Sequence, residues 1–408
     1  MRVLLSTTGT RGDVEPLVAL AAQLRALGAE VRVCAPPDQE FAQRLAEVGV
    51  SLAPVGPPVR PLMHEAGPPS TADLSRDATE MIAAQINQLA TAAEGCDALV
   101  AAGVMQLAAR SVAEKLSIHY VYASYCPVFL RSPHHPPLPL PGKPFPPDVT
   151  DNRVLWDLDA ESWNKVFGLA LNTNRLHMGL PPVSDVQSHV LTDEPWLAAD
   201  PILAPWRRPA DVYVTQTGAW TRPDDRPLTA ELEKFLDAGP PPVYVGFGSM
   251  RAPKDAARVA IEAIRAQGCR ALVARGWADL APIDDADDCF AIGEVNHQAL
   301  FGRVAAVVHH GGAGTTTAAA RAGAPQVVAP QMMDQRYWAR RVAGLGIGTA
   351  HSGPTPTTES LSAGLKAALT PDTRARATAV AGAIRTDGAA AAAQLLLDTI
   401  SREKSMSA

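Results

Sequence analysis

The chain has 408 residues, 47% of them hydrophobic, and a formal net charge of -6 at pH 7. This length is too great for one ordinary hydrophobic core, so about two domains are expected. The acidic balance argues against nucleic acid as the main partner, because proteins that follow a phosphate backbone usually carry a basic excess.

The cysteines and the apolar runs indicate the compartment. The five cysteines are widely spaced, and they form neither a CxxC pair nor a Cys/His cluster with zinc-ligand spacing. The apolar run at 3–5 is too short for the h-region of a signal peptide. No apolar stretch approaches the ~18 residues of a spanning helix. A cytoplasmic protein without a membrane partner is therefore expected.

Short β-branched runs alternate with amphipathic segments in the first half, a pattern typical of a doubly wound parallel sheet. A helix is expected at 15–27, with leucines along one face and Gly28 after its end. A second helix is expected at 154–176. The expected strands are 2–6, 30–35, 51–55, 98–102 and 119–124.

Two proline-rich segments interrupt this alternation. Segment 132–147 is half proline and reads either as an interdomain linker or, as we prefer, as a long loop of the first domain beside a site. Prolines also recur through 200–242. The predicted domains are a Rossmann-like domain at 1–205, a linker at 206–241, a second Rossmann-like domain at 242–385, and a helix at 386–408 that could cross back to the first domain.

The alternation restarts after the second proline-rich segment. The last segment of the chain, 360–400, reads as consecutive helices with a break at Gly388. Strands are expected at 243–247, 270–274, 289–292 and 305–308, and helices at 255–267, 315–322 and 337–345. The predicted fold class is α/β with two Rossmann-like doubly wound domains that face an interdomain cleft.

The sequence HHGGAGTT at 309–316 is the strongest chemical signal. It spans the turn from an expected strand into an expected helix. Glycines let backbone N–H groups approach an anion closely, and the helix N-terminus adds partial positive charge. His310 and Thr315 can donate hydrogen bonds as well. This turn therefore predicts a phosphate site.

Ligands of doubly wound sheets lie beyond the carboxyl ends of the strands, so the other turns at these ends are also candidates. The turn at 7–13 holds Arg11, which suits phosphate, and Asp13, which suits proton abstraction. Alternatively, Arg11 pairs with Asp13 or Glu15 at the start of a helix. The GxxG in this turn, from Gly9 to Gly12, is only a weak sign of a dinucleotide site. The turn after 243–247 offers Ser249.

Asp334 and Gln335 can accept from and donate to vicinal sugar hydroxyls. The alternative for Asp334 is a helix N-cap. The run DDADD at 284–288 contains a DxD, but it reads as a solvated acidic loop, and the pairs His134–His135 and His309–His310 lack metal-site partners. No metal and no cofactor are expected.

Taken together, these segments resemble the GT-B nucleotide-sugar glycosyltransferases, and most closely those that decorate vancomycin-like and teicoplanin-like aglycones. The resemblance covers essentially the whole chain. It is carried by MRVLLSTTGTRGDVEPLVALA, VRVCAPPD, LAADPILAP, PVYVGFGS, GEVNHQALFGRVAAVVHHGGAGTT and IRTDGAAAAAQLLLD.

The resemblance implies that the domain at 1–205 binds the acceptor and that the domain at 242–385 binds the nucleotide sugar. It also implies a role for particular residues. Asp13 would be the general base, and Asp334 with Gln335 would hold the donor sugar. Val295 would contact the nucleotide base through backbone groups. The residues expected around the donor phosphates are Thr10, Arg11, Ser249, His310, Gly312, Gly314 and Thr315. Relatives outside this subfamily often carry a ribose-binding Glu where this chain has Ala318, so ribose recognition would come from elsewhere.

The expected acceptor contacts are Met63, His64, Tyr125 and Phe129, while Trp156 and Trp163 are either acceptor-stacking or core residues. The predicted function is inverting, metal-independent transfer of glucose or N-acetylglucosamine from a UDP-sugar to a phenolic hydroxyl of a glycopeptide aglycone. A monomer is expected. The alternatives are a TDP-deoxysugar transferase, a non-catalytic helper of a partner transferase, and a sugar-nucleotide epimerase.

Overall fold

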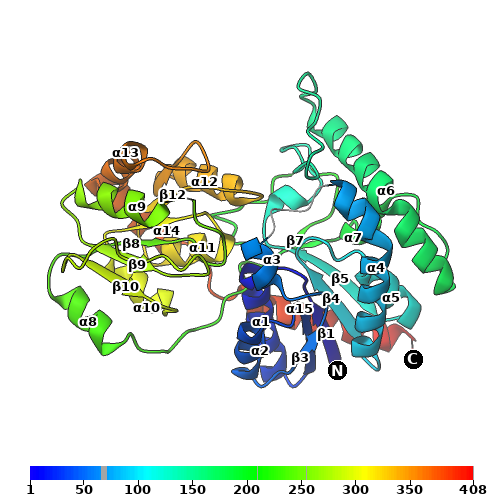
Figure 1. Ribbon diagram of the computed structural model, residues 1–408. Helices are drawn as coiled ribbons and strands as arrows, with labels where there is room; N and C mark the ends of the chain where they lie inside the picture. The colour runs from blue at the N-terminus through cyan, green and yellow to red at the C-terminus, as the bar shows by residue number, and fades with distance from the viewer. Residues whose placement is uncertain (66–70, 209, 254, 408) are drawn as a thin grey trace. The chain divides into compact units, whose positions relative to one another are not determined.

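The computed structural model describes residues 1–65, 71–208, 210–253 and 255–407, and it divides into two compact units (Figure 1). The first unit comprises Met1–Asp200, Pro205–Arg222 and Thr386–Ala408. The second comprises Pro201–Ala204 and Pro223–Arg385. The C-terminal segment therefore belongs to the same unit as the N-terminus.

The described part of the first unit is built on a seven-stranded sheet with the order β3-β2-β1-β4-β5-β6-β7. All of its neighbouring strands are parallel. Its strands are β1 (Arg2–Ser6), β2 (Glu30–Ala35), β3 (Leu52–Pro54), β4 (Ala98–Ala102), β5 (His119–Ser124), β6 (Trp196–Leu197) and β7 (Thr215–Gln216).

Helices cover the sheet of the first unit. Buried residues of α4 (Thr71–Ala93), α5 (Ala109–Leu116), α6 (Asn152–His177) and α7 (Val186–Leu191) form one core with side chains of β1, β2 and β4. The remaining helices of this unit are α1 (Arg11–Ala26), α2 (Gln39–Ala46), α3 (Val59–Glu65), η1 (Pro127–Phe129) and α15 (Gly388–Ser407), of which α15 packs against α1.

The second unit repeats this arrangement with a six-stranded parallel sheet of order β10-β9-β8-β11-β12-β13 among its described residues. The strands are β8 (Val243–Gly246), β9 (Ala271–Ala274), β10 (Cys289–Ile292), β11 (Ala306–His309), β12 (Gln326–Val328) and β13 (Gly348–Ala350). In both sheets the winding changes direction beside the first strand, between β1 and β4 and between β8 and β11. Ligands of doubly wound sheets bind at this switch point.

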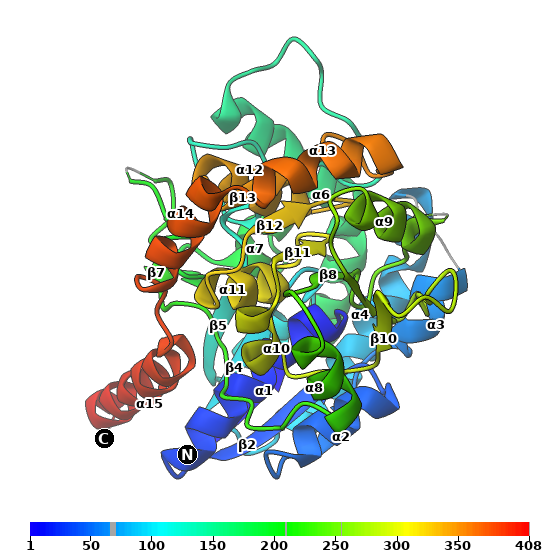
Figure 2. The same cartoon turned by 90° about the vertical axis from the view of Figure 1, so that its left-hand side faces the viewer.

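Two apolar cores pack against the second sheet. The helices that contribute to them can be followed by their labels in Figure 2. Helices α9 (Ala256–Arg265) and α13 (Thr358–Ala368) contribute to one core, while α8 (Ala230–Asp237), α10 (His297–Leu300), η2 (Phe301–Arg303) and α11 (Ala313–Arg321) contribute to the other. The remaining helices are α12 (Gln335–Gly344) and α14 (Pro371–Ala381). The predicted fold class of two doubly wound α/β units is confirmed.

Several boundaries differ from the sequence expectation. Helix α1 begins at Arg11 rather than at 15, and Pro16 lies inside it. Proline lacks an N–H and usually marks the first helical turn, which is why the start was placed too late. The expected linker at 206–241 contains β7 and α8. Gly388, the expected break, is the first residue of α15.

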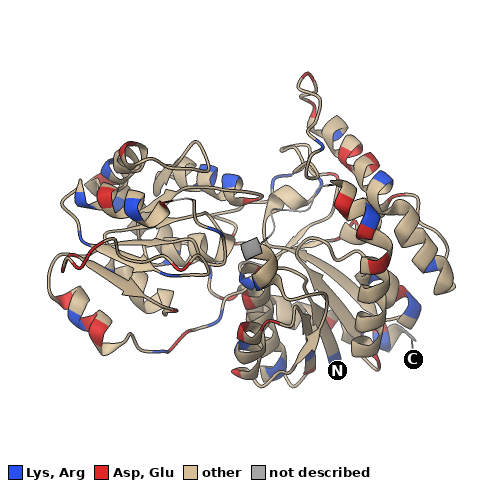
Figure 3. Cartoon of the chain, viewed as in Figure 1, with Lys and Arg blue, Asp and Glu red and all other residues tan. Residues whose placement is uncertain are grey.

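Charged residues of both signs occur along the described helices of both units. In Figure 3, acidic and basic residues are interspersed along the helices of each unit. Cys34, Cys96 and Cys126 are buried, and Cys269 and Cys289 are partly buried. Among the described residues, no helix has the length and hydropathy needed to cross a bilayer.

Candidate active site

Asp13 lies at the switch point of the first sheet, in the first turn of α1. Its Oδ2 accepts the backbone N–H of Thr10, the N-cap residue, at 3.0 Å. An acidic residue three positions into a helix, bound to the N-cap amide, completes one half of a capping box. The bond orients the carboxylate at the carboxyl end of β1.

Two glycines make room for this carboxylate. A Cβ on Gly103, which follows β4 and has φ +81°, would lie 2.7 Å from the Asp13 Oδ1 atom. A Cβ on Gly9 would lie 2.0 Å from Oδ2. Both distances are too short for an alanine, so the Asp13 position depends on glycine in the turns after the two neighbouring strands β1 and β4. Gly103 was not predicted as a site residue, and its only signal is a glycine directly after a strand.

Two tyrosines surround the same aspartate. Tyr125, an expected acceptor contact, donates its hydroxyl to the backbone carbonyl of Asp13 at 3.0 Å, and its ring packs edge-on against Trp220 with 6.0 Å between centroids. Burial, followed by the Asp13 charge, raises the pKa of Tyr122 and of Tyr125 above the usual value. Both phenols therefore stay protonated. The Tyr122 hydroxyl, which sequence reasoning missed, is buried without a hydrogen-bond partner among the described residues.

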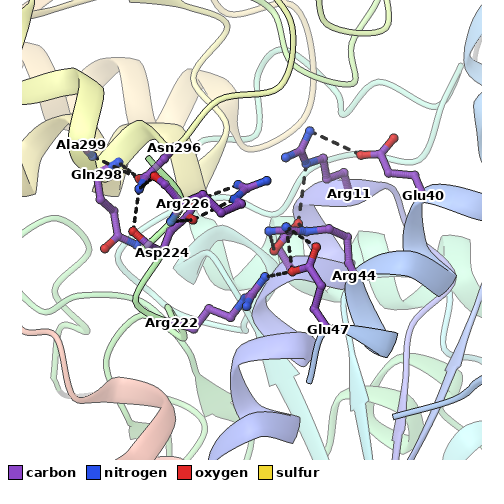
Figure 4. A network of polar contacts seen from close by, with 11 residues as sticks. Arg11, Glu40, Arg44, Glu47, Arg222, Asp224, Arg226, Asn296, Gln298 and Ala299 are labelled. Atoms are coloured by element: carbon purple, nitrogen blue, oxygen red, sulfur yellow. Dashed lines mark hydrogen bonds and ion pairs between the residues drawn. The ribbon is translucent and has the colours of Figure 1, made fainter. Parts of the chain in front are cut away.

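Arg11 belongs to an ion-pair network of the first unit (Figure 4). Its guanidinium lies 3.7 Å from Glu15 and 3.4 Å from Glu40. Glu15 is also held by Arg44 through two bonds of 2.6 and 3.1 Å. Arg11 thus pairs with Glu15, as the alternative from the sequence proposed, but at a distance beyond a good hydrogen bond. Glu15 therefore pairs with two arginines, Arg11 and Arg44, and Arg11 pairs with two glutamates, Glu15 and Glu40.

The turn between β11 and α11 lies at the switch point of the second sheet, next to the turn after β8. The His310 ring lies between two glycines of these turns. A Cβ on Gly248 would approach it to 3.3 Å, and a Cβ on Gly312 would lie 2.7 Å from Nε2. Burial, reinforced by the neighbouring His309, lowers the pKa of His310 to about 3. His310 is therefore neutral near pH 7 and can only act as a neutral donor or acceptor.

His309 is a buried residue whose hydrogen bonds stabilise the turn after β11. It is fully buried, its Nδ1 accepts the N–H of Gly311 at 3.1 Å, and its Nε2 lies 2.9 Å from Gln326 Oε1. These partners require a neutral ring with the proton on Nε2. Gly311 itself has φ +92° and contacts β12 too closely for a side chain. His309 and Gly311 fix the backbone on which His310 is presented.

The first turn of α11 has backbone N–H groups without acceptors inside the helix. The hydroxyls of Thr316 and Thr317 bond back to the carbonyls of Gly312 and Ala313, at 2.9 and 2.8 Å. Gly314 is exposed, and a Cβ there would meet no atom within 4 Å. Thr315 is partly exposed on the same turn. This turn has the features of an anion site.

Ser249 and Val295 follow strands β8 and β10, which lie on either side of β9 in the second sheet. Gly248 accepts the N–H of Trp277 at 2.8 Å, which sets the backbone just before Ser249. Val295 is partly buried and precedes Asn296, whose side chain caps α10 and donates to the carbonyls of Asp224 and Arg226 at 2.6 and 2.9 Å (Figure 4). Both residues are thus held by their neighbours at the same edge of the sheet.

Asp334 is at the N-cap position of α12, but its side chain caps no helix amide. Its Oδ2 accepts the indole N–H of Trp338 at 2.8 Å. Burial raises the pKa of Asp334 to about 6, against the lowering effect of the Trp338 bond. Gln335 uses its Oε1 to accept the N–H groups of Gln331 and Met332 at 2.8 and 3.1 Å. A ligand would therefore meet the NH2 end of Gln335.

The other expected acceptor residues are less defined. Met63 is partly buried on α3, whereas the side chain of His64 lies outside the described residues. Phe129 is partly buried in η1. Trp156 and Trp163 are 2% and 9% exposed, and the Trp156 indole donates to the His135 carbonyl at 3.0 Å. Both tryptophans are core residues.

The acidic loop has a structural role. Asp284 and Asp288 both bind Arg265, at 2.7 Å each, and this contact lowers the pKa of Asp284 to about 2. In the part of the chain that the structure describes, no three His, Cys, Asp or Glu side chains are grouped as metal ligands.

This fold and site define a GT-B nucleotide-dependent transferase, and comparison with known proteins agrees. Residues 3–134 match the model of the glycosyltransferase family 28 N-terminal domain, and residues 280–394 match that of the erythromycin biosynthesis protein CIII-like C-terminal domain. A glycotransferase of kitacinnamycin superposes with a TM-score of 0.75 at 20% identity, with 97% of this chain and 98% of that chain covered.

Two relatives from Amycolatopsis orientalis align over 99% of each chain. They are vancomycin aglycone glucosyltransferase, at 60% identity, and dTDP-epi-vancosaminyltransferase, at 50%. The chain belongs to this family of glycopeptide-antibiotic glycosyltransferases. It is an enzyme that transfers a sugar from a nucleotide-sugar donor to an acceptor.

Proposed function

We propose that this enzyme transfers glucose or N-acetylglucosamine from a UDP-sugar to a phenolic hydroxyl of a glycopeptide-antibiotic aglycone, with inversion at the anomeric carbon. The observation that carries the proposal is the 60% identity, over 99% of both chains, to vancomycin aglycone glucosyltransferase. The residues described above supply a base, an anion-binding turn and a sugar-binding pair that suit this reaction.

The proposed reaction is a single displacement. Asp13 removes the proton of the acceptor hydroxyl as the oxygen attacks the anomeric carbon. The bond to the UDP β-phosphate oxygen breaks on the opposite side, and the sugar-binding pair Asp334 and Gln335 holds the hexose. A phenol needs only a modest base because its pKa lies near 10.

Charge on the leaving UDP is stabilised by groups that are already in place. The N-terminal amides of α11 and the neutral His310 donate to the diphosphate, with Ser249 and Thr315 as further donors. Thr10 and Arg11 are proposed to contact the phosphates from the first unit, and Val295 to hold the base. Because these groups account for the negative charge, we propose that the reaction needs neither metal nor cofactor.

A TDP-deoxysugar transferase is the second candidate, favoured by the 50% identity to dTDP-epi-vancosaminyltransferase. The two candidates differ in the sugar hydroxyls that Asp334 and Gln335 would bind. A non-catalytic helper has no use for a base at Asp13 and is disfavoured. UDP-glucose, UDP-N-acetylglucosamine and a TDP-deoxysugar should each be assayed with glycopeptide aglycones. Preference for a UDP-hexose is expected, and turnover only with the TDP-deoxysugar would contradict the proposal.

A further inference from the structure

The side chains of Asp334 and Trp338 are joined one helical turn apart at the start of α12. The Trp338 ring is 1% exposed, and its N–H donates to Asp334 Oδ2 at 2.8 Å. An indole N–H is a donor only, and a ring buried in the core cannot turn away from its partner. The bond therefore restricts the rotation of the Asp334 carboxylate.

The loop before α12 is also held by hydrogen bonds. Gln335 accepts two backbone N–H groups of this loop, and Met333 takes up φ +52°, a conformation that is uncommon outside glycine. The carboxylate of Asp334 and the NH2 group of Gln335 are thus both fixed by bonds made at their other ends. Fixed polar groups lose less freedom when a ligand binds than flexible ones do.

We propose that Trp338 is a positioning residue for the donor sugar: it ties one carboxylate oxygen of Asp334 so that the other oxygen meets a sugar hydroxyl. This inference rests on the sugar-binding role proposed for Asp334. Trp338 should then affect binding of the sugar but not binding of the nucleotide, because the indole acts only through the Asp334 carboxylate.

The chain contains a matched control for this contact. Asp159 and Trp163 are also one turn apart, on α6 of the first unit, and burial raises the pKa of Asp159 to about 6. Unlike Asp334 Oδ2, Asp159 Oδ1 has no hydrogen-bond partner among the described residues. Asp159 is 3% exposed and binds Gln187 at 2.6 Å. Trp163→Phe therefore removes a similar buried indole N–H without touching a proposed site residue.

The test compares Trp338→Phe, Trp163→Phe and Asp334→Asn by calorimetric binding of UDP-glucose and of UDP, together with Tm and the pH dependence of kcat/KM. Trp338→Phe should weaken UDP-glucose binding about tenfold, the effect expected when one hydrogen bond to a charged group is lost. It should leave UDP binding unchanged. It should also move the acidic limb of the kcat/KM profile upward by about one pH unit. The reason is that Asp334 loses the indole N–H that lowers its pKa. Trp163→Phe should lower Tm only.

A Trp338→Phe enzyme with lower Tm but unchanged UDP-glucose binding and an unchanged acidic limb would overturn the positioning role. If Asp334→Asn also binds UDP-glucose normally, the sugar-binding role itself fails. Should Trp338→Phe not fold, the wild-type enzyme provides the test. The indole N–H resonance of Trp338 should titrate with the Asp334 carboxyl near pH 6. A resonance that is constant between pH ~4 and pH ~8, about two units on either side of that value, would contradict the contact.

Discussion

The backbone N–H of Thr10 binds the carboxylate of Asp13 at 3.0 Å, so the residue proposed as general base is held by the helix that carries it. An amide oxygen can accept the same bond, whereas it cannot remove a proton. Asp13→Asn should therefore leave Tm and UDP binding close to wild type and lower kcat by about 10²–10⁴-fold. The measurements are steady-state kinetics, calorimetry and thermal unfolding.

The control for this substitution is Asp185→Asn. Asp185 also accepts a backbone amide at a helix start, that of Ser188 at 3.0 Å, and has no proposed catalytic role. The Asp185→Asn variant should retain full turnover. Near-wild-type turnover of Asp13→Asn would eliminate Asp13 as the base.

Gly103→Ala tests whether the space around Asp13 matters. The new Cβ would lie 2.7 Å from Asp13 Oδ1, so the carboxylate has to move. Gly28→Ala is the matched control, because Gly28 has φ +83° and no atom within 4 Å of its Cβ position. Both substitutions should cost about 1 kcal/mol of unfolding free energy from backbone strain. Only Gly103→Ala should reduce kcat, by about tenfold or more, and equal kcat losses in the two variants would contradict the argument.

The pH dependence should distinguish Asp334 from His310. Burial raises the pKa of Asp334 to about 6, so the ionised form that accepts a sugar hydroxyl is lost as pH falls through about 6. The pKa of His310 is lowered to about 3, so this ring stays neutral across that range. We expect kcat/KM to fall below pH 6 in the wild type and in His310→Gln alike. An acidic limb that disappears in His310→Gln would assign it to the histidine instead.

His310→Ala should weaken UDP binding and lower kcat, because it removes the ring between the turns after β8 and β11. The expected loss is about tenfold or more in kcat/KM, typical of one donor to a developing negative charge. His351→Ala is a control in the same unit, since His351 binds the Ser360 hydroxyl and the Gly353 carbonyl away from this turn. Undiminished activity of His310→Ala would remove its proposed phosphate role.

Much of the fold could be predicted because its strands are short apolar runs between clear turn signals, and β1, β2, β4, β5 and β10 have the expected bounds. The start of α1 was misplaced because Pro16 marks a first turn by local rules, while the capping residue Thr10 lies further back. Helix α8 in the expected linker was not predicted because the surrounding segment is rich in proline.

Sequence patterns indicate where a candidate site lies, but they do not predict the contacts around it. Glycines and hydroxyls after strands mark where a ligand can bind, since that follows from local geometry. The contacts of Tyr125 with Asp13 and of Arg44 with Glu15 join residues distant in sequence, so no local pattern indicates them. The charge state of His310 depends on burial, which is also a property of the folded chain.

Metal removal gives a direct test of the electrostatic part of the mechanism. If α11 and the donors around it stabilise the leaving diphosphate, turnover should be unchanged in excess EDTA. Added MgCl2 or MnCl2 should raise kcat less than twofold, roughly the scatter of such assays, because no Lewis acid has to supply the several kcal/mol of charge stabilisation. Activity that is lost in EDTA and restored by manganese would contradict the metal-free reaction.

The central claim is inverting hexosyl transfer to a phenol of a glycopeptide aglycone. It is tested most directly by incubating the enzyme with UDP-α-glucose and the vancomycin aglycone, then determining the product by mass spectrometry and NMR. The account predicts one added hexose on a phenolic oxygen with a β-anomeric linkage. An α-linked product, or no transfer from UDP-glucose and UDP-N-acetylglucosamine alike, would contradict it.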